Sequence, residues 1–286
     1  MTTRPDRPKV AVPAIAARKR RDGAEPVVMI TAYDTPFARI VDDAGVDVIL
    51  VGDSVADNVL GFPDTLQVGV AEMAHHVAAV ARAHPRALVV ADMPWMSYHV
   101  APDDALRNAA TLVRAGAEAV KLEGGRRRVP AVQAIVDAEI PVVGHIGLTP
   151  QSVRALGGLR VQARDPEAAA ELVLDAKALA AAGCFAIVLE GVPDAVAAVA
   201  TEAVNVPTIG IGAGAGCDGQ VLVLHDVLGL SDREPPKFVR RYADLAADAR
   251  EAVARYASDV RSGAFPADPE TYHASPSLRE ALAGRG

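Results

Sequence analysis

The chain has 286 residues, of which 51% are hydrophobic and only 4% aromatic, so Ala, Val, Leu and Ile have to fill a large core. Its 36 acidic and 29 basic residues give a net charge of −7, which argues against general nucleic-acid binding. No apolar run approaches the roughly 18 residues of a membrane span. We therefore expect a large globular protein with no nucleic-acid or membrane partner.

The N-terminal segment is basic and contains a predicted surface helix. Pro13 suits the first turn of a helix, and the basic residues 18–21 would follow at its C-terminal end. We expect these residues and a second basic cluster, 126–128, to lie on solvated faces. The segment lacks the apolar stretch of a signal peptide, so we expect a cytoplasmic location.

Eight strand-like apolar runs alternate with Ala-rich amphipathic stretches. The strands are expected at 27–33, 46–53, 87–92, 119–123, 141–146, 185–190, 206–211 and 220–224. The helices are expected at 35–44, 70–83, 103–115, 130–138, 166–182 and 193–203. Strands that are apolar on both faces and alternate with helices form a parallel sheet covered on both sides. The pattern predicts an α/β fold of the (β/α)8 TIM-barrel type, with a typical length of about 250 residues.

Other segments complete a single predicted domain, 1–286. Residues 54–68 are long for a simple loop and interrupted by Gly and Pro, which suits either a lid or an ordered packing loop. A C-terminal helical extension is expected at 235–261. The termini, 1–12 and 275–286, are expected to be flexible.

Two patterns that resemble known sites are interpreted as structural. The Gly-rich run 210–216 resembles a dinucleotide-binding loop, but a strand follows it where a helix would be required. Two cysteines are too few for a disulfide framework, so we expect Cys184 and Cys217 to be small core residues.

Four of the apolar runs end in a carboxylate: Asp53, Asp92, Glu123 and Glu190. The carboxyl ends of barrel strands meet at one rim, where barrel enzymes have their active sites. Asp53, Asp92 and Glu123 offer only oxygen ligands, which suit Mg²⁺ or another hard divalent cation better than zinc. The alternative is that each Asp merely caps the helix that follows it.

Further polar residues belong to the same strand ends. Lys121 and Glu123 are two positions apart, so both side chains face the barrel interior, and Lys121 could hold a substrate oxygen or simply pair with an acid. His145 ends the fifth run and is a possible contact at the same rim. Glu190 lies across the barrel from Asp53 and suits a general base. Asp34 either is buried beneath the rim or faces the substrate.

Several motifs follow one another over about residues 13–273. They are TAYD (31–34), VGDSVADNVLG (51–61), ADMPWMSY (91–98), NAATLVRAGAEAVKLEGG (108–125), GHIGLTPQSV (144–153), VLEGVP (188–193), IGIGAG (209–214) with DGQVLVLHD (218–226), and AFPADPETYH (264–273). Together and in this order they resemble the ketopantoate hydroxymethyltransferase family. The chain differs from the family pattern by one extra residue near 98–102 and by Gly191, where some members carry Cys. Neither difference falls on an expected ligand.

The resemblance implies a cytoplasmic homodecamer that transfers a hydroxymethyl group from 5,10-methylenetetrahydrofolate to 3-methyl-2-oxobutanoate. The product would be 2-dehydropantoate, in the first step of pantothenate biosynthesis, formed through a Mg²⁺-stabilised enolate. Asp53 and Asp92 would bind both metal and substrate, and Glu123 would complete the metal site. Ser54 and Lys121 would contact the keto acid, and Glu190 would be the catalytic base.

Two other functions are weighed against this one. A related barrel enzyme of the phosphoenolpyruvate mutase and isocitrate lyase kind also binds 2-oxo acids on Mg²⁺, but its lyases depend on a cysteine in a lid loop, and 54–68 contains none. A non-catalytic barrel that serves as a binding protein would have no need to retain the acids and Lys121.

Overall fold

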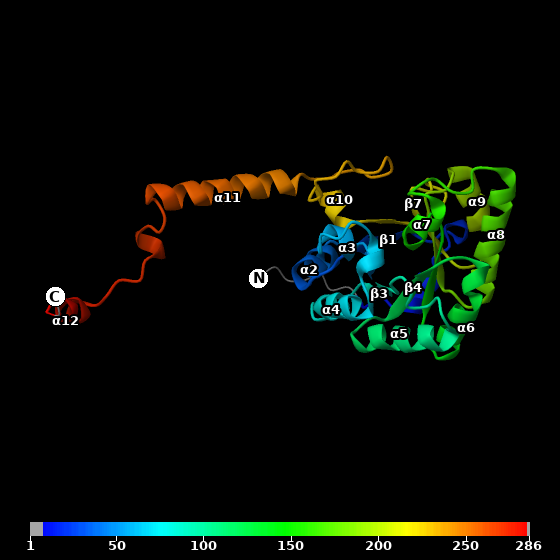
Figure 1. Ribbon diagram of the computed structural model, residues 1–286, viewed down its shortest axis with the longest axis horizontal. Helices are drawn as coiled ribbons and strands as arrows, with labels where there is room; N and C mark the ends of the chain where they lie inside the picture. Colours follow the sequence, from blue (N-terminus) through cyan, green and yellow to red (C-terminus); the bar gives the residue numbers. More distant parts are fainter. Residues whose placement is uncertain (1–7, 285–286) are drawn as a thin grey trace.

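The computed structural model describes residues 8–284 and shows a closed barrel from which a C-terminal arm extends (Figure 1). Parallel strands close the barrel in chain order, each hydrogen-bonded to the next and the last to the first. They are β1 (Val27–Thr31), β2 (Val48–Val51), β3 (Leu88–Asp92), β4 (Ala119–Glu123), β5 (Val142–Gly147), β6 (Ala186–Glu190), β7 (Thr208–Ile211) and β8 (Gly219–Leu222). The predicted (β/α)8 fold and all eight predicted strands are confirmed.

Helices account for most of the links between strands and cover the outside of the barrel, except for the last two, which extend away from it. They are α1 (Val12–Ala16), α2 (Thr35–Asp43), α3 (Val55–Asn58), α4 (Val70–Ala81), α5 (Pro102–Arg114), α6 (Val129–Asp137), α7 (Val153–Leu156), α8 (Pro166–Ala181), α9 (Asp194–Glu202), α10 (Leu224–Leu228), α11 (Leu245–Ser262) and α12 (Pro276–Ala283). Short 3-10 turns are η1 (Arg20–Asp22), η2 (Thr65–Gln67), η3 (Arg126–Arg128), η4 (Pro150–Ser152) and η5 (Asp268–Glu270). The six helices predicted between strands match α2, α4, α5, α6, α8 and α9.

Alternation along each strand divides the apolar residues between two cores. On β2, Val48 and Leu50 belong to the cluster that fills the barrel, whereas Ile49 and Val51 belong to the larger cluster beneath the helices. Side chains of successive strand residues point to opposite faces, so a strand buried on both sides has to be apolar throughout. This is why the strands could be recognised from continuous Val, Ile and Leu runs.

Local chemistry sets several helix boundaries. Asp34 caps α2, because its Oδ1 accepts a hydrogen bond from the backbone N–H of Phe37 at 2.8 Å. Asp34 is half-buried and caps the helix that follows it, and whether it also faces the substrate stays open. In the same way Asp165 caps α8 by accepting from the N–H of Ala168.

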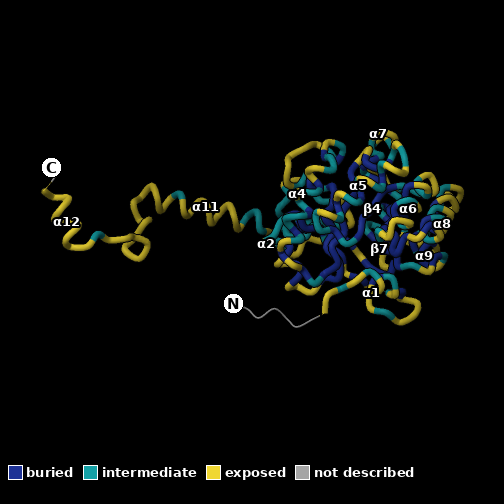
Figure 2. Tube along the Cα trace, turned by 90° about the horizontal axis from the view of Figure 1, so that it is seen from below, coloured by how far each residue is buried: buried dark blue, intermediate teal, exposed yellow. Residues whose placement is uncertain are grey.

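The C-terminal helix begins later than predicted. Residues 235–261 were expected to be helical, but α11 begins at Leu245, with Asp244 as its cap. Pro235 and Pro236 lie in the irregular segment before it, and a proline inside a helix removes a backbone donor and disrupts the preceding turn. From there α11 and α12 project away from the barrel as an exposed arm (Figures 1 and 2).

The N-terminal helix is confirmed, but it ends at Ala16, before the basic residues. The expectation that residues 18–21 lie on a solvated face is wrong for Lys19, whereas Arg20 and Arg21 are exposed. Lys19 is 3% exposed, and its ammonium lies 2.7 Å from Asp218 Oδ2 and donates to the carbonyl of Thr201 at 2.8 Å. Arg126 in the second basic cluster is more exposed and pairs with Glu171 and Asp175.

The remaining predicted segments lie as follows. Residues 54–68 contain α3 and η2, and the Gly-rich run 210–216 leads into β8 without a helix, as expected. Cys184 and Cys217 are buried and unpaired, as expected. The flexibility of 1–12 and 275–286 stays a prediction: 1–7 and 285–286 lie outside the described residues, and 276–283 form α12. Within residues 8–284, no helix combines the length and apolar character needed to cross a membrane.

Candidate active site

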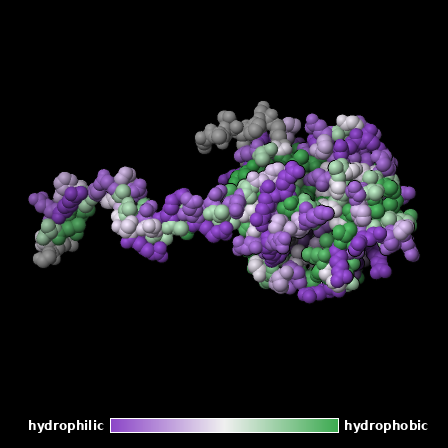
Figure 3. Space-filling view, turned by 90° about the horizontal axis from the view of Figure 1, so that it is seen from above, coloured by the Kyte–Doolittle hydropathy of each residue, from purple (hydrophilic) through white to green (hydrophobic). Residues whose placement is uncertain are grey.

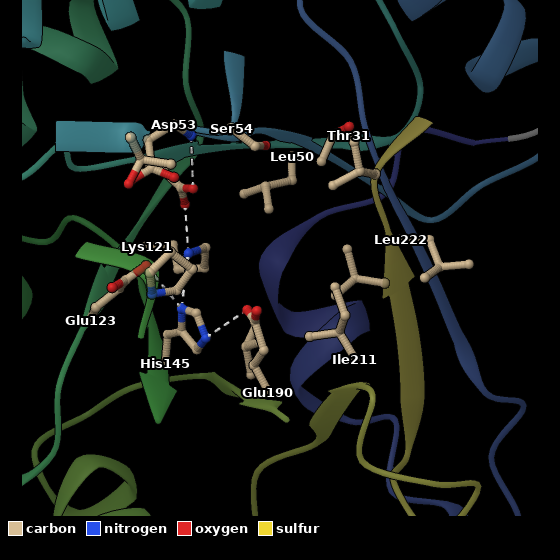
Figure 4. Close-up of a pocket in the computed structure, with 16 residues that line it drawn as sticks. Thr31, Leu50, Asp53, Ser54, Lys121, Glu123, His145, Glu190, Ile211 and Leu222 are labelled. Atoms are coloured by element: carbon tan, nitrogen blue, oxygen red, sulfur yellow. Dashed lines mark hydrogen bonds and ion pairs between the residues drawn. The ribbon is translucent and has the colours of Figure 1, made fainter. Parts of the chain in front are cut away.

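A cavity of about 120 Å³ opens at the C-terminal ends of the barrel strands (Figure 4). All the polar residues singled out from the strand ends line this cavity, namely Asp53, Ser54, Asp92, Lys121, Glu123, His145 and Glu190. Figure 4 shows Asp53, Lys121, Glu123 and His145 on one side and the apolar Ile211 and Leu222 on the other, with Glu190 and Leu50 between them. The cavity can therefore accept a small molecule with one charged and one apolar end.

Strand register and alternation bring these residues together. Asp92 at the end of β3 lies opposite Lys121 on β4, and Glu123 lies opposite His145 on β5. Each lies an even number of positions from a residue of its own strand that fills the barrel interior, namely Val90 on β3, Ala119 on β4 or Val143 on β5, so its side chain faces inward. Parallel strands end at the same rim, and the inward positions near that rim become the cavity wall.

Gly52 allows the first two acids to meet. A Cβ atom at this position would lie 2.8 Å from Ser54 Oγ and 3.5 Å from Asp92 Oδ2. Without that atom, the backbone N–H of Asp53 donates to Asp92 Oδ2 at 3.0 Å. The two aspartates are therefore adjacent at the rim, although neither side chain is bonded to the other.

Three carboxylates share a small buried volume. Asp53, Asp92 and Glu123 are 5%, 3% and 4% exposed. Burial, followed by repulsion from Asp92 and Glu123, raises the pKa of Asp53 well above its usual value. A divalent cation between these groups would relieve this repulsion, because it would favour the ionised form of each carboxylate.

Lys121 supplies the nearest positive charge. It is 4% exposed, and its Nζ lies 2.9 Å from Asp92 Oδ1. Burial on its own lowers the pKa of Lys121, but the attraction of Asp92, Glu123 and Asp53 outweighs burial and raises it. The lysine is therefore held as a cation inside the barrel mouth.

His145 lies between two acids on opposite sides of its ring. Its Nδ1 is 3.4 Å from Glu123 Oε1, and its Nε2 is 3.2 Å from Glu190 Oε2. Burial and Lys121 lower the pKa of His145, but the contacts with the two glutamates outweigh them and raise it to about 9. The same imidazole lowers the pKa of Glu123 against the opposing effect of burial.

Sequence reasoning missed Tyr33, Tyr98 and Gln151, which form hydrogen bonds to the expected site residues or to each other. The Tyr33 hydroxyl lies 2.8 Å from Ser54 Oγ, and burial raises its pKa. Gln151 donates to Asp53, and Tyr98 in turn donates to Gln151. All three occur within the motifs TAYD, ADMPWMSY and GHIGLTPQSV, and polar residues in otherwise buried motifs are the signal that could have identified them.

The donor set fits a hard cation. Asp53, Asp92 and Glu123 offer carboxylate oxygens only, the ligands that Mg²⁺ prefers. Asp92 Oδ1 is buried and makes no hydrogen bond, although the Lys121 ammonium is at ion-pair distance from it. As folded, however, no three His, Cys, Asp or Glu side chains of the described part of the chain stand in a ready metal-binding arrangement. Binding a cation would therefore require these carboxylates to adjust.

Comparison with protein families and curated proteins gives consistent matches. The sequence profile described as "Ketopantoate hydroxymethyltransferase" matches residues 9–268. A 3-methyl-2-oxobutanoate hydroxymethyltransferase 2 of Bradyrhizobium diazoefficiens is 54% identical over 275 residues, which cover 96% of this chain and 93% of the relative. A 3-methyl-2-oxobutanoate hydroxymethyltransferase of Pyrobaculum islandicum is 59% identical over 245 residues, covering 86% and 94%.

Solved structures with the same fold are more distant in sequence. A phosphonopyruvate hydrolase matches with a TM-score of 0.59 at 15% identity, covering 96% of each chain. A 2,3-dimethylmalate lyase of the phosphoenolpyruvate mutase/isocitrate lyase superfamily matches with a TM-score of 0.56 at 17% identity, covering 97% of this chain and 96% of the lyase. At such identities the likeness concerns the barrel fold alone.

Proposed function

Because this chain belongs to the ketopantoate hydroxymethyltransferase family, we propose that it converts 3-methyl-2-oxobutanoate to 2-dehydropantoate in pantothenate biosynthesis. The hydroxymethyl group comes from 5,10-methylenetetrahydrofolate, the co-substrate that such a transfer implies. The observation that carries the proposal is the identity of 54% over 96% of the chain with a protein of this activity. The cavity supports it independently, because it has a charged wall and an apolar wall.

The shape of the keto acid fits this division of the cavity. Its carboxylate and keto oxygens are polar, and its branched alkyl end is apolar. The polar end would lie towards Lys121 and Ser54, and the alkyl end towards Leu50 and Ile211. A buried ammonium next to a developing oxyanion lowers the energy of the charge that forms when the neighbouring C–H ionises.

Asp53 and Asp92 would hold a Mg²⁺ ion or another divalent cation, with Glu123 completing the site. When bound, such a cation supplies Lewis acidity towards the keto oxygen. The closest partners of these carboxylates are an amide, an ammonium and an imidazole at separate oxygens. A bound cation would favour the ionised form of Asp53, against the burial and repulsion that raise its pKa. Lys121 and the cation would then share the charge of the substrate oxygens.

Glu190 would be the base that removes the C3 proton. It ends β6, which stands across the closed strand order from β2, and its side chain is 15% exposed and lines the cavity. The Nε2 atom of His145 lies 3.2 Å from one of its oxygens and limits its rotation. From the wall opposite Asp53, the Glu190 carboxylate would reach C3 of the keto acid when the substrate's carboxylate and keto oxygens face Asp53 and Asp92.

A lyase of the isocitrate lyase kind is the alternative enzyme. Its fold is shared, but the rim insert 54–68 contains no cysteine. The two cysteines of the chain are buried elsewhere, and burial raises the pKa of Cys184 to about 12, which leaves its sulfur protonated and unreactive near neutral pH. A non-catalytic binding protein is the other alternative, and the cost of burying three carboxylates and a lysine without a chemical use speaks against it.

We also propose that the protein assembles with copies of itself, as a homodecamer, and acts in the cytoplasm. The C-terminal arm supports self-association. In α11 the apolar side chains of Val253, Tyr256 and Val260 are 66%, 57% and 46% exposed, and their spacing places them on one face. Figure 3 shows this arm standing apart from the barrel, with hydrophobic and hydrophilic residues interspersed along it.

The experiment that tests the reaction separates proton removal from group transfer. The protein is incubated in D2O with 3-methyl-2-oxobutanoate, with or without Mg²⁺ and without folate, and deuterium at C3 is followed by NMR. We expect cation-dependent incorporation, followed by formation of 2-dehydropantoate once 5,10-methylenetetrahydrofolate is added. Absence of both incorporation and product would contradict the proposed function.

A further inference from the structure

Gln151 makes hydrogen bonds to residues at the C-terminal ends of three strands, β2, β3 and β4. It lies in η4, immediately after β5, and is 5% exposed. Its side-chain Nε2 donates to Asp53 Oδ2 at 2.7 Å and to the carbonyl oxygen of Met93 at 2.9 Å. Its backbone N–H donates to Glu123 Oε2 at 3.0 Å. One residue thus bonds two of the expected cation ligands and the backbone next to the third, Asp92.

Tyr98 sets the orientation of this amide. The Tyr98 hydroxyl donates to Gln151 Oε1 at 2.5 Å and accepts the backbone N–H of Glu123 at 3.1 Å. Because a carbonyl oxygen only accepts, Met93 requires the NH2 end of the Gln151 side chain to face it. The two contacts agree on one orientation, in which both amide hydrogens and the amide oxygen have partners.

The bonds from Gln151 distinguish the two oxygens of each acid. On Asp53 and Glu123 one oxygen, Oδ2 and Oε2 respectively, is engaged by Gln151. The other oxygen is left for a different partner, and Glu123 Oε1 faces His145. A carboxylate with one oxygen held cannot rotate freely, so part of the entropy that cation binding would cost is already lost in the fold, and the adjustment that remains concerns the free oxygens.

The amide is also suited to this position by its lack of charge. A lysine or arginine here would neutralise Asp53 and compete with a cation for it. A further carboxylate would add a like charge to a buried site that already holds three acids. A neutral donor satisfies a buried oxygen without adding a charge of either sign.

We propose that Gln151, oriented by Tyr98, is a positioning residue that sets the carboxylates of Asp53 and Glu123 to receive a divalent cation. This inference rests on the proposed function, because it assumes that these acids bind a metal. Partners that orient metal ligands typically contribute roughly 10–100-fold to metal affinity. The role differs from that of Lys121 and His145, which bring charge to the acids rather than a neutral donor.

The test is direct titration of the purified full-length protein with Mn²⁺, monitored by electron paramagnetic resonance of the free ion. The variants are Gln151→Met, which keeps approximate length and removes the amide, and Gln162→Met as a matched control. Gln162 is a glutamine on the same β5–β6 connection, and its amide donates to the carbonyl of Arg160 and not to an acid. We expect the Mn²⁺ Kd of Gln151→Met to rise about 10–100-fold and that of Gln162→Met to match wild type.

The signal of bound Mn²⁺ provides a second readout that loss of stability alone would not move. A folded Gln151→Met protein should show a changed zero-field splitting, because the ligand geometry is altered. An unchanged Kd in a folded variant would overturn the inference. Should Gln151→Met fail to fold, Gln151→Asn decides in the same way, since the shorter amide keeps the backbone bond to Glu123 but cannot reach Asp53.

An Asp92→Asn variant distinguishes a failure of the proposed metal site from a failure of the proposed role of Gln151. If Asp92→Asn weakens Mn²⁺ binding but Gln151→Met does not, the positioning role is refuted and the metal site still stands. Wild-type protein that binds no Mn²⁺ would overturn both.

Discussion

The imidazole Nε2 of His145 lies 3.2 Å from Glu190 Oε2, at ion-pair distance but without the geometry of a hydrogen bond. The other ring nitrogen faces Glu123. One histidine therefore joins the expected base on β6 to the expected metal ligand on β4. The side chain proposed as the base therefore lies against the same residue as one of the acids proposed to hold the cation.

Glu190→Gln should abolish proton removal while leaving the cavity intact. The amide keeps the shape of the side chain but cannot accept the C3 proton, so we expect deuterium exchange at C3 to fall about 100- to 10,000-fold. Calorimetry should show nearly unchanged binding of 3-methyl-2-oxobutanoate. Glu167→Gln, on the exposed first turn of α8, is the matched control. Exchange at the wild-type rate in Glu190→Gln would exclude the base role.

Asp92→Ala should affect both ligand binding and stability. Removing a residue that only orients a metal ligand typically costs roughly 10–100-fold in metal affinity. Because Asp92 is itself an expected ligand, we expect the cation-dependent affinity for the keto acid to fall by more than this. The variant also leaves the Lys121 ammonium buried without its partner, which should cost about 3–5 kcal/mol of unfolding free energy. Calorimetry with and without Mg²⁺ and urea unfolding measure the two effects. The control is Asp103→Ala, on the surface of α5; equal affinities in the two variants would speak against Asp92 as a ligand.

Lys19→Ala should destabilise the barrel without affecting C3 proton exchange. It leaves Asp218 buried, at 1% exposure, with no cation beside it, so we expect a loss of about 3–5 kcal/mol of unfolding free energy. The half-exposed Arg21→Ala should change stability by less than about 1 kcal/mol. Urea unfolding gives both values, and C3 exchange in the folded Lys19→Ala protein should be normal. A loss as small as that of Arg21→Ala would show that the buried pair is dispensable.

His99 should make stability depend on acid. Burial, and secondarily Arg128, lowers the pKa of His99 from 6.5 to about 4. Below pH 6.5 the unfolded chain takes up a proton that the folded protein refuses, so the stabilising effect of a neutral His99 is lost as the pH falls towards 4. We therefore expect the difference in unfolding free energy between wild type and His99→Asn to be constant above pH 7. Below pH 6, wild type should lose stability relative to His99→Asn. Parallel urea-unfolding profiles over pH 4.5–8 would contradict this pKa.

The exposed face of α11 should carry the assembly. We expect the double variant Val253→Glu with Tyr256→Glu to lower the mass measured by light scattering, because charges on this face would have to be buried between copies. Thermal unfolding of the barrel should still be observed. Glu251→Ala, which lies about opposite on the helix, should keep the wild-type mass. A wild-type monomer would contradict the proposed homodecamer, and a double variant with undiminished mass would contradict the role of the α11 face in assembly.

Much of the fold was predictable from the sequence because its signals are local. Strands such as β3 are apolar on both faces, and the helices between them repeat their apolar residues every three or four positions. Since parallel strands end at one rim, the acids at Asp53, Asp92 and Glu123 could be expected to lie near one another. The structure brings them to a single cavity, while their role as ligands stays a prediction.

The sequence by itself determined the elements, their order and which residues end the strands, because these depend on neighbours along the chain. Only the tertiary structure decided the contacts made by closing the barrel. Lys19 meets Asp218 and Gln151 meets Asp53 across distant parts of the chain, and no local periodicity marks such pairs. Their physical cause is desolvation: once closure buries a charged or polar group, it has to find a partner, and the fold determines which one lies within reach.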